Sequence, residues 1–164
     1  MAANGSNYVI DPLAIPDLSP LKPLFSHNKI QKIFHGADYD VRSLHRDFGI
    51  EINNLFDTEL ASRFLGIAET GLEAVVKQHL NIRLDKKYQK KDWSKRPLPT
   101  EMVEYAAGDV MYLLPISANL IEDLKRKNRL DWVIEECAYL SQVRSVSNDN
   151  APLFLKVKGA SRLS

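Results

Sequence analysis

Short apolar runs separate stretches of helical periodicity along the first half of the chain. Three of these runs, residues 8–10, 32–34 and 54–57, are closed by turn-forming or acidic residues, and they predict three strands. Each run is followed by apolar side chains at helical spacing, so the pattern predicts an α/β fold with mainly parallel strands. Three strands make a thin sheet for this much helix, and its edge should be covered by another strand.

Helical periodicity continues through the rest of the chain. Ser19 and Pro20 are expected to start the first helix, and Gly49 to end the second. A long helix beginning at Thr100 should be bent or interrupted by Pro115. The expected helices cover residues 20–25, 38–48, 58–65, 72–80, 100–124 and 130–143, with a polar basic loop over 85–99 and a linker over 145–164.

Composition narrows the classes of function without choosing among them. The net charge is +1, so any contact with nucleic acid must use locally concentrated positive charge. The single cysteine, Cys137, excludes an internal disulfide, and its apolar setting indicates a small buried side chain rather than a nucleophile. The sequence has neither a membrane-spanning apolar stretch nor a secretion signal, so we expect a cytoplasmic protein without a membrane partner. Its oligomeric state is left open.

Two carboxylates, Asp38 and Asp40, follow the second expected strand and His35. The carboxyl ends of parallel strands are where α/β sheets usually bind ligands, which makes both carboxylates candidates for chemistry. The first turn of a helix also favours negative charge, so simple capping explains the same residues without a catalytic role.

A second candidate lies on the long helix, where Tyr105 and Asp109 are four residues apart and share a face. A carboxylate among alanine, glycine and leucine is costly to bury without a partner, and a divalent cation is one such partner. The alternative is a partly exposed Asp109 with local hydrogen bonds.

The loop over residues 85–99 combines positive charge with aromatic rings. Its basic residues are interleaved with Tyr88 and Trp93, the mixture that phosphate neutralisation and base stacking require. A solvated basic loop explains the composition equally well.

Together these segments resemble the ribonuclease D branch of the DEDD exonuclease superfamily, which includes exosome-associated relatives in eukaryotes. The resemblance runs from about residue 8 to residue 114 and covers the family's second motif, its signature loop and its third motif in the tyrosine form. The residues that carry it are Phe34-His35-Gly36-Ala37, Asp40, Arg46-Asp47-Phe48-Gly49, Asn54-Leu55-Phe56-Asp57-Thr58, Leu84-Asp85-Lys86-Lys87-Tyr88-Gln89, Asp92-Trp93, Arg96-Pro97-Leu98, Tyr105, Asp109 and Tyr112-Leu113-Leu114.

The resemblance implies a ribonuclease H-like exonuclease fold and hydrolysis of RNA from the 3′ end, with precursors such as tRNA as substrates. Four carboxylates would hold two Mg²⁺ or Mn²⁺ ions around the terminal phosphodiester. By motif position, Asp40 would bind one metal and position the substrate, Asp109 would bind the metal that generates the nucleophile, and Tyr105 would orient or help deprotonate water. The implied contacts with nucleic acid are His35, Lys86, Lys87, Tyr88, Gln89, Lys91, Trp93 and Arg96.

One element of the family pattern has no counterpart before His35: the first motif, an Asp-x-Glu pair on the first strand. Asp57-Thr58-Glu59 spells it, but it follows the second motif and would require a circularly permuted sheet. Asp57 is better interpreted as a strand-end hydrogen-bonding residue, and either Asp57 or Thr58 can cap the helix that follows. Asp38 receives no family role.

We therefore expect an incomplete mixed sheet, its first strands missing, flanked by helices. Residues 1–144 would form a partial exonuclease domain, and 145–164 would lead toward a helical accessory domain. With two of four carboxylates, the chain alone should be inactive or nearly so. An upstream segment with the Asp-x-Glu strand should then raise activity by orders of magnitude.

Other hypotheses stay open at this point. A degenerate exonuclease could bind nucleic acid without hydrolysis, although metal ligands that repel phosphate do not help a binder. An interaction protein could dimerise through the exposed sheet edge. DNA 3′–5′ exonucleases share the fold. The prediction of RNA rather than DNA as substrate therefore rests only on the tyrosine form of the third motif and on the signature loop.

Overall fold

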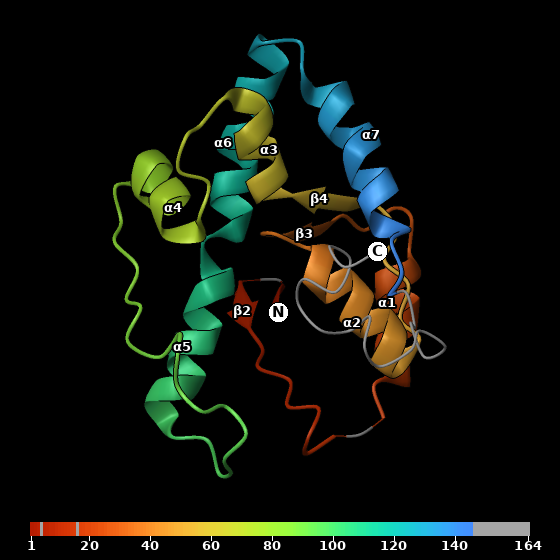
Figure 1. Cartoon of the computed structure of the whole chain (residues 1–164), viewed down its shortest axis with the longest axis vertical. Helices are drawn as coiled ribbons and strands as arrows, with labels where there is room; N and C mark the ends of the chain where they lie inside the picture. Colours follow the sequence, from red (N-terminus) through yellow and green to blue (C-terminus); the bar gives the residue numbers. More distant parts are fainter. Residues whose placement is uncertain (4, 16, 146–164) are drawn as a thin grey trace, which may run out of the picture.

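A computed structural model describes residues 1–3, 5–15 and 17–145 of the chain. Figure 1 shows two short strands crossing the middle of the molecule, with α3, α6 and α7 on one side and α1 and α2 on the other. The elements in chain order are β1 (Ala2–Ala3), β2 (Ser6–Asn7), a 3-10 helix (Ser19–Leu21), α1 (Lys22–Ser26), β3 (Lys32–Phe34), α2 (Asp38–Phe48), β4 (Leu55–Asp57), α3 (Thr58–Leu65), α4 (Leu72–Leu80), α5 (Thr100–Met111), α6 (Leu113–Arg126) and α7 (Leu130–Ser141). The expected linker lies, apart from Ser145, outside the described residues.

The central sheet pairs β3 with β4 in parallel, with Lys32 opposite Leu55 and Phe34 opposite Asp57. The strands expected over residues 32–34 and 54–57 are therefore confirmed. The latter begins one residue later, at Leu55, because Asn54 adopts a left-handed φ of 52°. The helix between them is also confirmed, and it ends at Gly49, whose φ of 59° suits a residue without a Cβ. With two strands among the described residues instead of three, this sheet is thinner than the sequence predicts.

The expected strand over residues 8–10 is wrong. The structure instead has an antiparallel hairpin of β1 and β2, and Tyr8 exchanges two hydrogen bonds of 2.7 Å with Met1 beside it. Tyr8 and Val9 remain 53% and 42% exposed. A strand needs a neighbour for its backbone groups, and the described ranges place none beside residues 9 and 10.

Ser19 does not cap a helix as expected. The Asp17 carboxylate accepts a hydrogen bond of 2.9 Å from the Ser19 N–H, and residues 19–21 form a 3-10 turn before α1. Pro23 explains the change, because it lacks the N–H that would close the first α-helical turn onto the Ser19 carbonyl. The Lys22 N–H closes a tighter turn onto that carbonyl instead.

Asp57 joins the carboxyl ends of both strands. Its buried carboxylate accepts hydrogen bonds from the N–H groups of Gly36 at 3.0 Å and Ala37 at 2.7 Å, where β3 leads into α2. It also accepts from Glu59 at 2.8 Å and Leu60 at 3.3 Å, which caps α3. The interpretation of Asp57 as a strand-end hydrogen-bonding residue and helix cap is confirmed.

Asp38 and Asp40 do lie in the first turn of α2, where the helix dipole favours negative charge, but they do not cap it by hydrogen bonds. Neither Asp38 nor Asp40 makes a side-chain cap hydrogen bond, because Asp57 serves that end of the helix. The exposed Asp38 pairs instead with Arg42, one helical turn along, with 3.0 Å between Nε and Oδ2. Asp40 is left without a structural partner of this kind.

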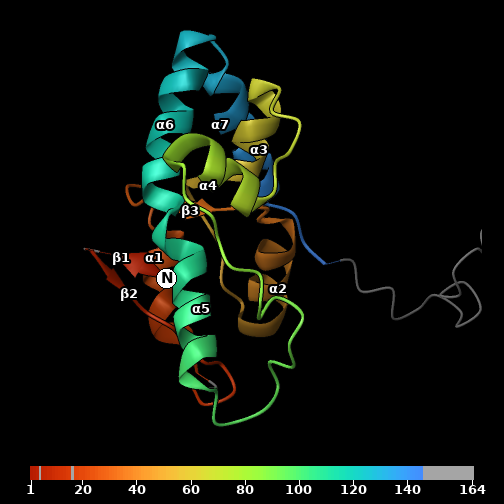
Figure 2. The ribbon, with the colours of Figure 1, turned by 90° about the vertical axis from the view of Figure 1, so that its left-hand side faces the viewer.

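The long helix is interrupted as expected. α5 ends at Met111 and α6 begins at Leu113, with Pro115 in its first turn. Pro115 has no N–H for the Met111 carbonyl and its ring crowds that carbonyl, so the break falls just ahead of the proline. Figure 2 shows α5 as a separate segment that extends beyond the end of α6.

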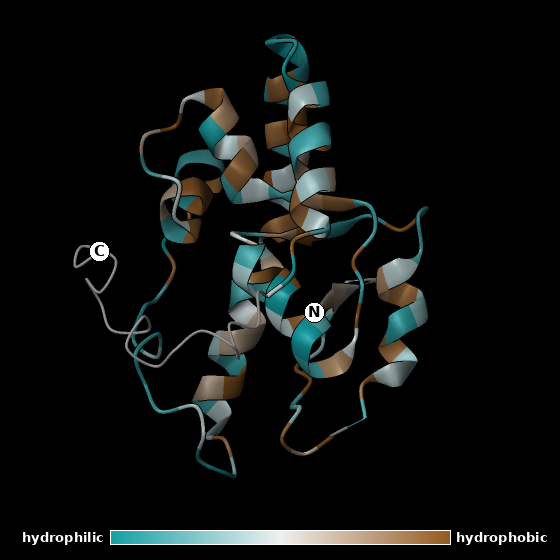
Figure 3. Ribbon diagram, turned by 45° about the vertical axis from the view of Figure 1, so that its right-hand side comes forward, coloured by the Kyte–Doolittle hydropathy of each residue, from teal (hydrophilic) through white to brown (hydrophobic). Residues whose placement is uncertain are grey.

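The core lies between the sheet and the helices around it. Figure 3 shows hydrophobic segments in brown along the helices around the two strands. Buried apolar residues of α2, β4, α4, α6 and α7 form one core cluster. Its fully buried members include Val41, Phe56, Val75, Val76, Ile116, Leu120 and Val133. Cys137 is also fully buried, and burial raises the pKa of its thiol to about 11, which confirms a packing role rather than a nucleophile. Among the described helices, none has the length and apolar character needed to span a membrane.

Replacing Asp57 by Asn should destabilise the fold severely. The amide keeps one acceptor oxygen and turns a donor toward backbone N–H groups, so about 3 kcal/mol of unfolding free energy should be lost. Urea unfolding measures this. The matched control is Asp38→Asn, which removes an exposed ion pair and should cost below about 1 kcal/mol. Equal losses in the two variants would contradict the role given to Asp57.

Candidate active site

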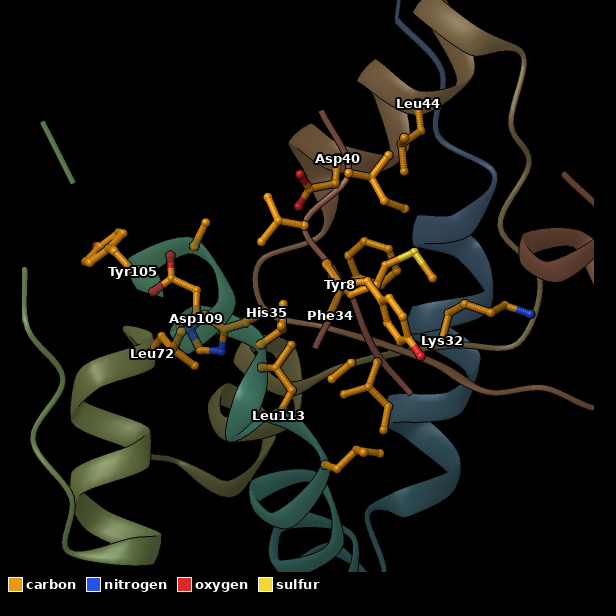
Figure 4. Close-up of a pocket in the computed structure, with 18 of the residues that line it drawn as sticks. Tyr8, Lys32, Phe34, His35, Asp40, Leu44, Leu72, Tyr105, Asp109 and Leu113 are labelled. Atoms are coloured by element: carbon orange, nitrogen blue, oxygen red, sulfur yellow. The ribbon is translucent and has the colours of Figure 1, made fainter. Parts of the chain in front are cut away.

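A pocket of about 1260 Å³ gathers the candidate catalytic side chains (Figure 4). Asp40 enters it from the first turn of α2, His35 from the end of β3, and Tyr105 and Asp109 from α5. Much of the remaining wall is apolar and includes Phe34. The structure thus brings together groups from two halves of the chain that the sequence analysis identified separately.

Both pocket carboxylates are held in surroundings that disfavour their charge. The pocket walls displace water from Asp40, although its side chain remains exposed at the rim, and this raises the pKa of Asp40; the nearby Asp57 raises it further. Loss of water also raises the pKa of the half-buried Asp109. In the described ranges neither carboxylate has a Lys, Arg or His within salt-bridge distance. The pair therefore suits a ligand that supplies positive charge.

His35 forms part of the pocket wall as a neutral ring. Its Nδ1 lies 2.9 Å from the Thr58 hydroxyl, and that hydroxyl donates to the Phe34 carbonyl at 2.9 Å. Burial lowers the pKa of His35, partly opposed by the charges of Asp57 and Glu59. A neutral imidazole can exchange hydrogen bonds with a substrate, but it adds no positive charge at neutral pH.

Tyr105 lies against two aromatic side chains of the basic loop. Its ring centroid is 5.9 Å from that of Tyr88 in an edge-on arrangement and 6.1 Å from that of Trp93. Burial raises the pKa of Tyr105, as do the charges of Asp109 and Asp85. The phenol therefore keeps its proton at neutral pH and is available as a hydrogen-bond donor.

The loop over residues 85–99 is less free than its composition suggests. Lys86 pairs with Glu73 at 2.5 Å, and Arg96 forms two bonds of 2.6 Å to the Asp11 carboxylate. The Lys87 ammonium sits 5.0 Å from the centre of the Tyr88 ring. The basic side chains that the sequence analysis assigned to phosphate thus include two that are already engaged within the protein.

The candidate nucleic-acid contacts are spread over two surfaces. His35, Lys86, Gln89 and Trp93 line the large pocket, whereas Lys87 and Tyr88 line a smaller one on the other side of Tyr105. Lys91 is exposed outside both, and Arg96 is committed to Asp11. Asp11 and Glu73 were missed from the sequence, because no local pattern indicates an ion pair formed across so many residues.

The donor set fits an oxygen-preferring divalent cation only in part. Mg²⁺ is commonly held by one or two carboxylates together with water and phosphate oxygens, and Asp40 and Asp109 are of that kind. Within the described ranges, however, no three His, Cys, Asp or Glu side chains form a metal-binding cluster. These residues are thus suited to part of a two-ion site rather than to a complete one.

Residues 2–125 match the model of a family described as 3′–5′ exonuclease. The chain belongs to this exonuclease family. Among curated relatives, ribonuclease D of Sphingobium indicum is 36% identical over 156 residues, which are 93% of this chain and 40% of that protein. Human exosome complex component 10 is 40% identical over 111 residues, or 67% of this chain and 12% of that protein. The exonuclease chain described here thus spans less than half the length of the relatives it matches.

Solved structures agree with this assignment. The catalytic core of RRP6 from Trypanosoma brucei has a TM-score of 0.74 and 37% identity, covering 84% of this chain and 39% of that one. Ribonuclease D of Escherichia coli, an exoribonuclease involved in structured RNA processing, has a TM-score of 0.73 and 35% identity, covering 80% of this chain and 35% of that one. The α/β fold of the exonuclease type that the sequence predicts is confirmed.

Replacing Asp109 by Asn should stabilise the exonuclease chain at neutral pH. A raised pKa means that the folded state favours the protonated acid, so the ionised carboxylate costs stability above that pKa and costs nothing below the unfolded value. Urea midpoints at pH 7.5 and pH 3.5 should show a gain for the variant at the higher pH that shrinks at the lower one.

Added Mn²⁺ gives a second measure of the same carboxylate. It should raise the melting temperature of the unmodified chain more than that of Asp109→Asn. Asp131→Asn, an exposed carboxylate on α7, should keep the full response to Mn²⁺. An equal Mn²⁺ response in Asp109→Asn would show that Asp109 binds no cation.

Proposed function

We propose that this chain is the part of a ribonuclease D-type 3′–5′ exoribonuclease that supplies Asp40, Asp109 and Tyr105 to the hydrolytic site. The observation that supports it is that one pocket brings together a protonated phenol and two carboxylates, from α2 and α5, that form no ion pair with the described residues. A binding module gains nothing from such carboxylates, because they repel phosphate. A hydrolase that uses Mg²⁺ or Mn²⁺ needs them.

The residues of this chain divide the work in the proposed reaction. Asp40 and Asp109 would hold the divalent cation, which when bound neutralises phosphate charge and acidifies water. Tyr105 lies one helical turn from Asp109 on the same face, and its raised pKa keeps the hydroxyl protonated. We therefore assign to Tyr105 the orientation of the attacking water through a hydrogen bond, rather than its deprotonation.

RNA is the proposed substrate, in single-stranded 3′ ends such as those of tRNA-type precursors. The names of the relatives support RNA, and Lys87, Gln89 and Lys91 remain available to phosphate or bases near the pocket. DNA of the same sequence serves as the comparison substrate.

Purified chain should be incubated with 5′-labelled single-stranded RNA and Mn²⁺, beside the same DNA. Any cleavage by the chain should appear as a ladder that shortens one nucleotide at a time from the 3′ end, and Asp109→Asn should abolish it. Tyr105→Phe should slow it by roughly 10²-fold, the size of a lost catalytic proton contact. Asp131→Asn should cleave like the unmodified chain. Cleavage that survives Asp109→Asn would point to a contaminating nuclease and against the proposal.

Only two of the four carboxylates that the family resemblance implies, Asp40 and Asp109, are assigned in this chain, and this predicts a low rate of cleavage. The chain alone should cleave weakly or not at all, and fusion of a ribonuclease D strand carrying Asp-x-Glu ahead of Met1 should raise the rate by at least roughly 10²-fold. The matched control fusion carries Asn-x-Gln. If both fusions are equally inactive but retain RNA at low salt, the non-catalytic binding hypothesis replaces the hydrolytic one.

A further inference from the structure

We propose that the loop over residues 85–99 positions Tyr105, with Trp93 and Tyr88 holding its ring and the Arg96–Asp11 ion pair holding Trp93 in place. The proposal rests on the function given above for Tyr105. It changes the role of three residues that the sequence analysis assigned to nucleic acid, because their contacts in the structure are made within the protein.

Two rings restrict the phenol of Tyr105 from different sides. Tyr88 meets it edge-on at 5.9 Å between centroids, and Trp93 meets it at 6.1 Å with the planes tilted by 42°. The Trp93 indole N–H donates to the Tyr88 carbonyl at 3.1 Å, which ties the two loop residues to each other. One hydrogen bond within the loop thus links the residues that carry both rings, and both rings contact the Tyr105 ring.

Arg96 connects this part of the loop to the N-terminal segment. Its Nε and Nη2 each lie 2.6 Å from an oxygen of Asp11, a two-pronged pairing that fixes orientation as well as distance. Its Nη1 donates to the carbonyls of Trp93 at 2.7 Å and Lys95 at 2.8 Å. One guanidinium therefore joins the backbone beside the Trp93 ring to a carboxylate far away in the sequence.

Asp11 is itself held in a fixed turn. Its carboxylate accepts from the Leu13 N–H at 3.1 Å, and its carbonyl accepts from the N–H groups of Ala14 and Ile15 at 3.1 and 2.9 Å. Both partners of the ion pair are only partly exposed, at 32% for Arg96 and 22% for Asp11. The pair lies at the protein surface, so its hold on the loop comes from its two-pronged geometry and not from burial.

Positioning and base stacking predict different losses when the Trp93 ring is removed. If Trp93 stacks on a base, removing its ring should weaken RNA affinity by roughly 5-fold to 100-fold, whatever happens to Tyr105. A positioning ring should leave affinity nearly unchanged and should expose Tyr105 to water. Because burial is the largest cause of the raised pKa of Tyr105, that pKa should then fall toward its ordinary value. The charges of Asp109 and Asp85 also raise this pKa, and Lys86 lowers it. The test variants therefore keep these three residues, and they also keep the charged residues of the adjoining small pocket, Lys87, Glu101 and Glu104.

The deciding experiment titrates Tyr105 by tyrosinate absorbance, with Tyr105→Phe subtracted as the blank in each variant. Trp93→Ala should lower the ionisation pH of Tyr105, Trp93→Phe should restore most of it, and the dissociation constant for single-stranded RNA should change by less than about 2-fold, below the loss of a stacked base. Trp132→Ala, the exposed tryptophan on α7, should change neither quantity. An unchanged Tyr105 titration in Trp93→Ala overturns the proposal whatever the RNA affinity.

A second variant keeps all three rings and tests the anchor. Asp11→Asn, in a Trp132→Phe background, should make Trp93 fluorescence more accessible to acrylamide and should move the Tyr105 titration in the same direction as Trp93→Ala. No change in either quantity overturns the role of the ion pair. Neither the Tyr105 titration nor the fluorescence measurement requires cleavage. A failure of the positioning proposal can therefore be distinguished from a failure of the proposed hydrolytic function. In a cleaving fusion, Trp93→Ala should lower kcat by roughly 10-fold with KM unchanged, the pattern of a misplaced group.

Discussion

The buried carboxylate of Asp57 is the interaction on which the rest of the site depends. It accepts four backbone hydrogen bonds, two where β3 turns into α2 and two where α3 begins. Both strands of the sheet therefore end against one group, and unpaired N–H groups would be left in the interior without it. Because α2 starts at this junction, the place of Asp40 in the pocket follows from the place of Asp57, and so does part of its raised pKa. The next residue, Thr58, continues the junction by binding His35.

The opposite wall of the pocket is held by different means. α6 packs against α3, α4 and β3, whereas α5 extends beyond the break ahead of Pro115 and carries Tyr105 and Asp109. A helix that leaves the core in this way needs other contacts to fix its side chains. The hairpin of β1 and β2 contacts α5, and the aromatic contacts of the basic loop, with the Arg96–Asp11 pair behind them, hold the Tyr105 ring. The site is thus formed between a rigid strand junction and a helix whose catalytic face is held by a loop.

Local rules account for the elements that the sequence predicted correctly. Gly49 ends α2, Asp57 caps α3 and Pro115 interrupts the long helix, and each effect acts within a few residues. The errors arise where distant partners decide. A strand over residues 8–10 needs a neighbour. Lys86 and Arg96 were assigned to nucleic acid because sequence composition does not show that they pair with Glu73 and Asp11. The site residues were found through motif resemblance, whereas their meeting in one pocket required the fold.

The balance of charge around the pocket favours a cation between protein and substrate. Asp40 and Asp109 are disfavoured as anions, His35 is neutral, and Lys86 and Arg96 are already neutralised by carboxylates. A phosphate that approached this surface unaided would meet two negative charges and little free positive charge. A divalent cation held by Asp40 and Asp109 would supply the positive charge that a phosphate needs there. The two carboxylates that would repel a phosphate are therefore the groups that would hold the cation, which is why hydrolysis explains their presence better than binding alone.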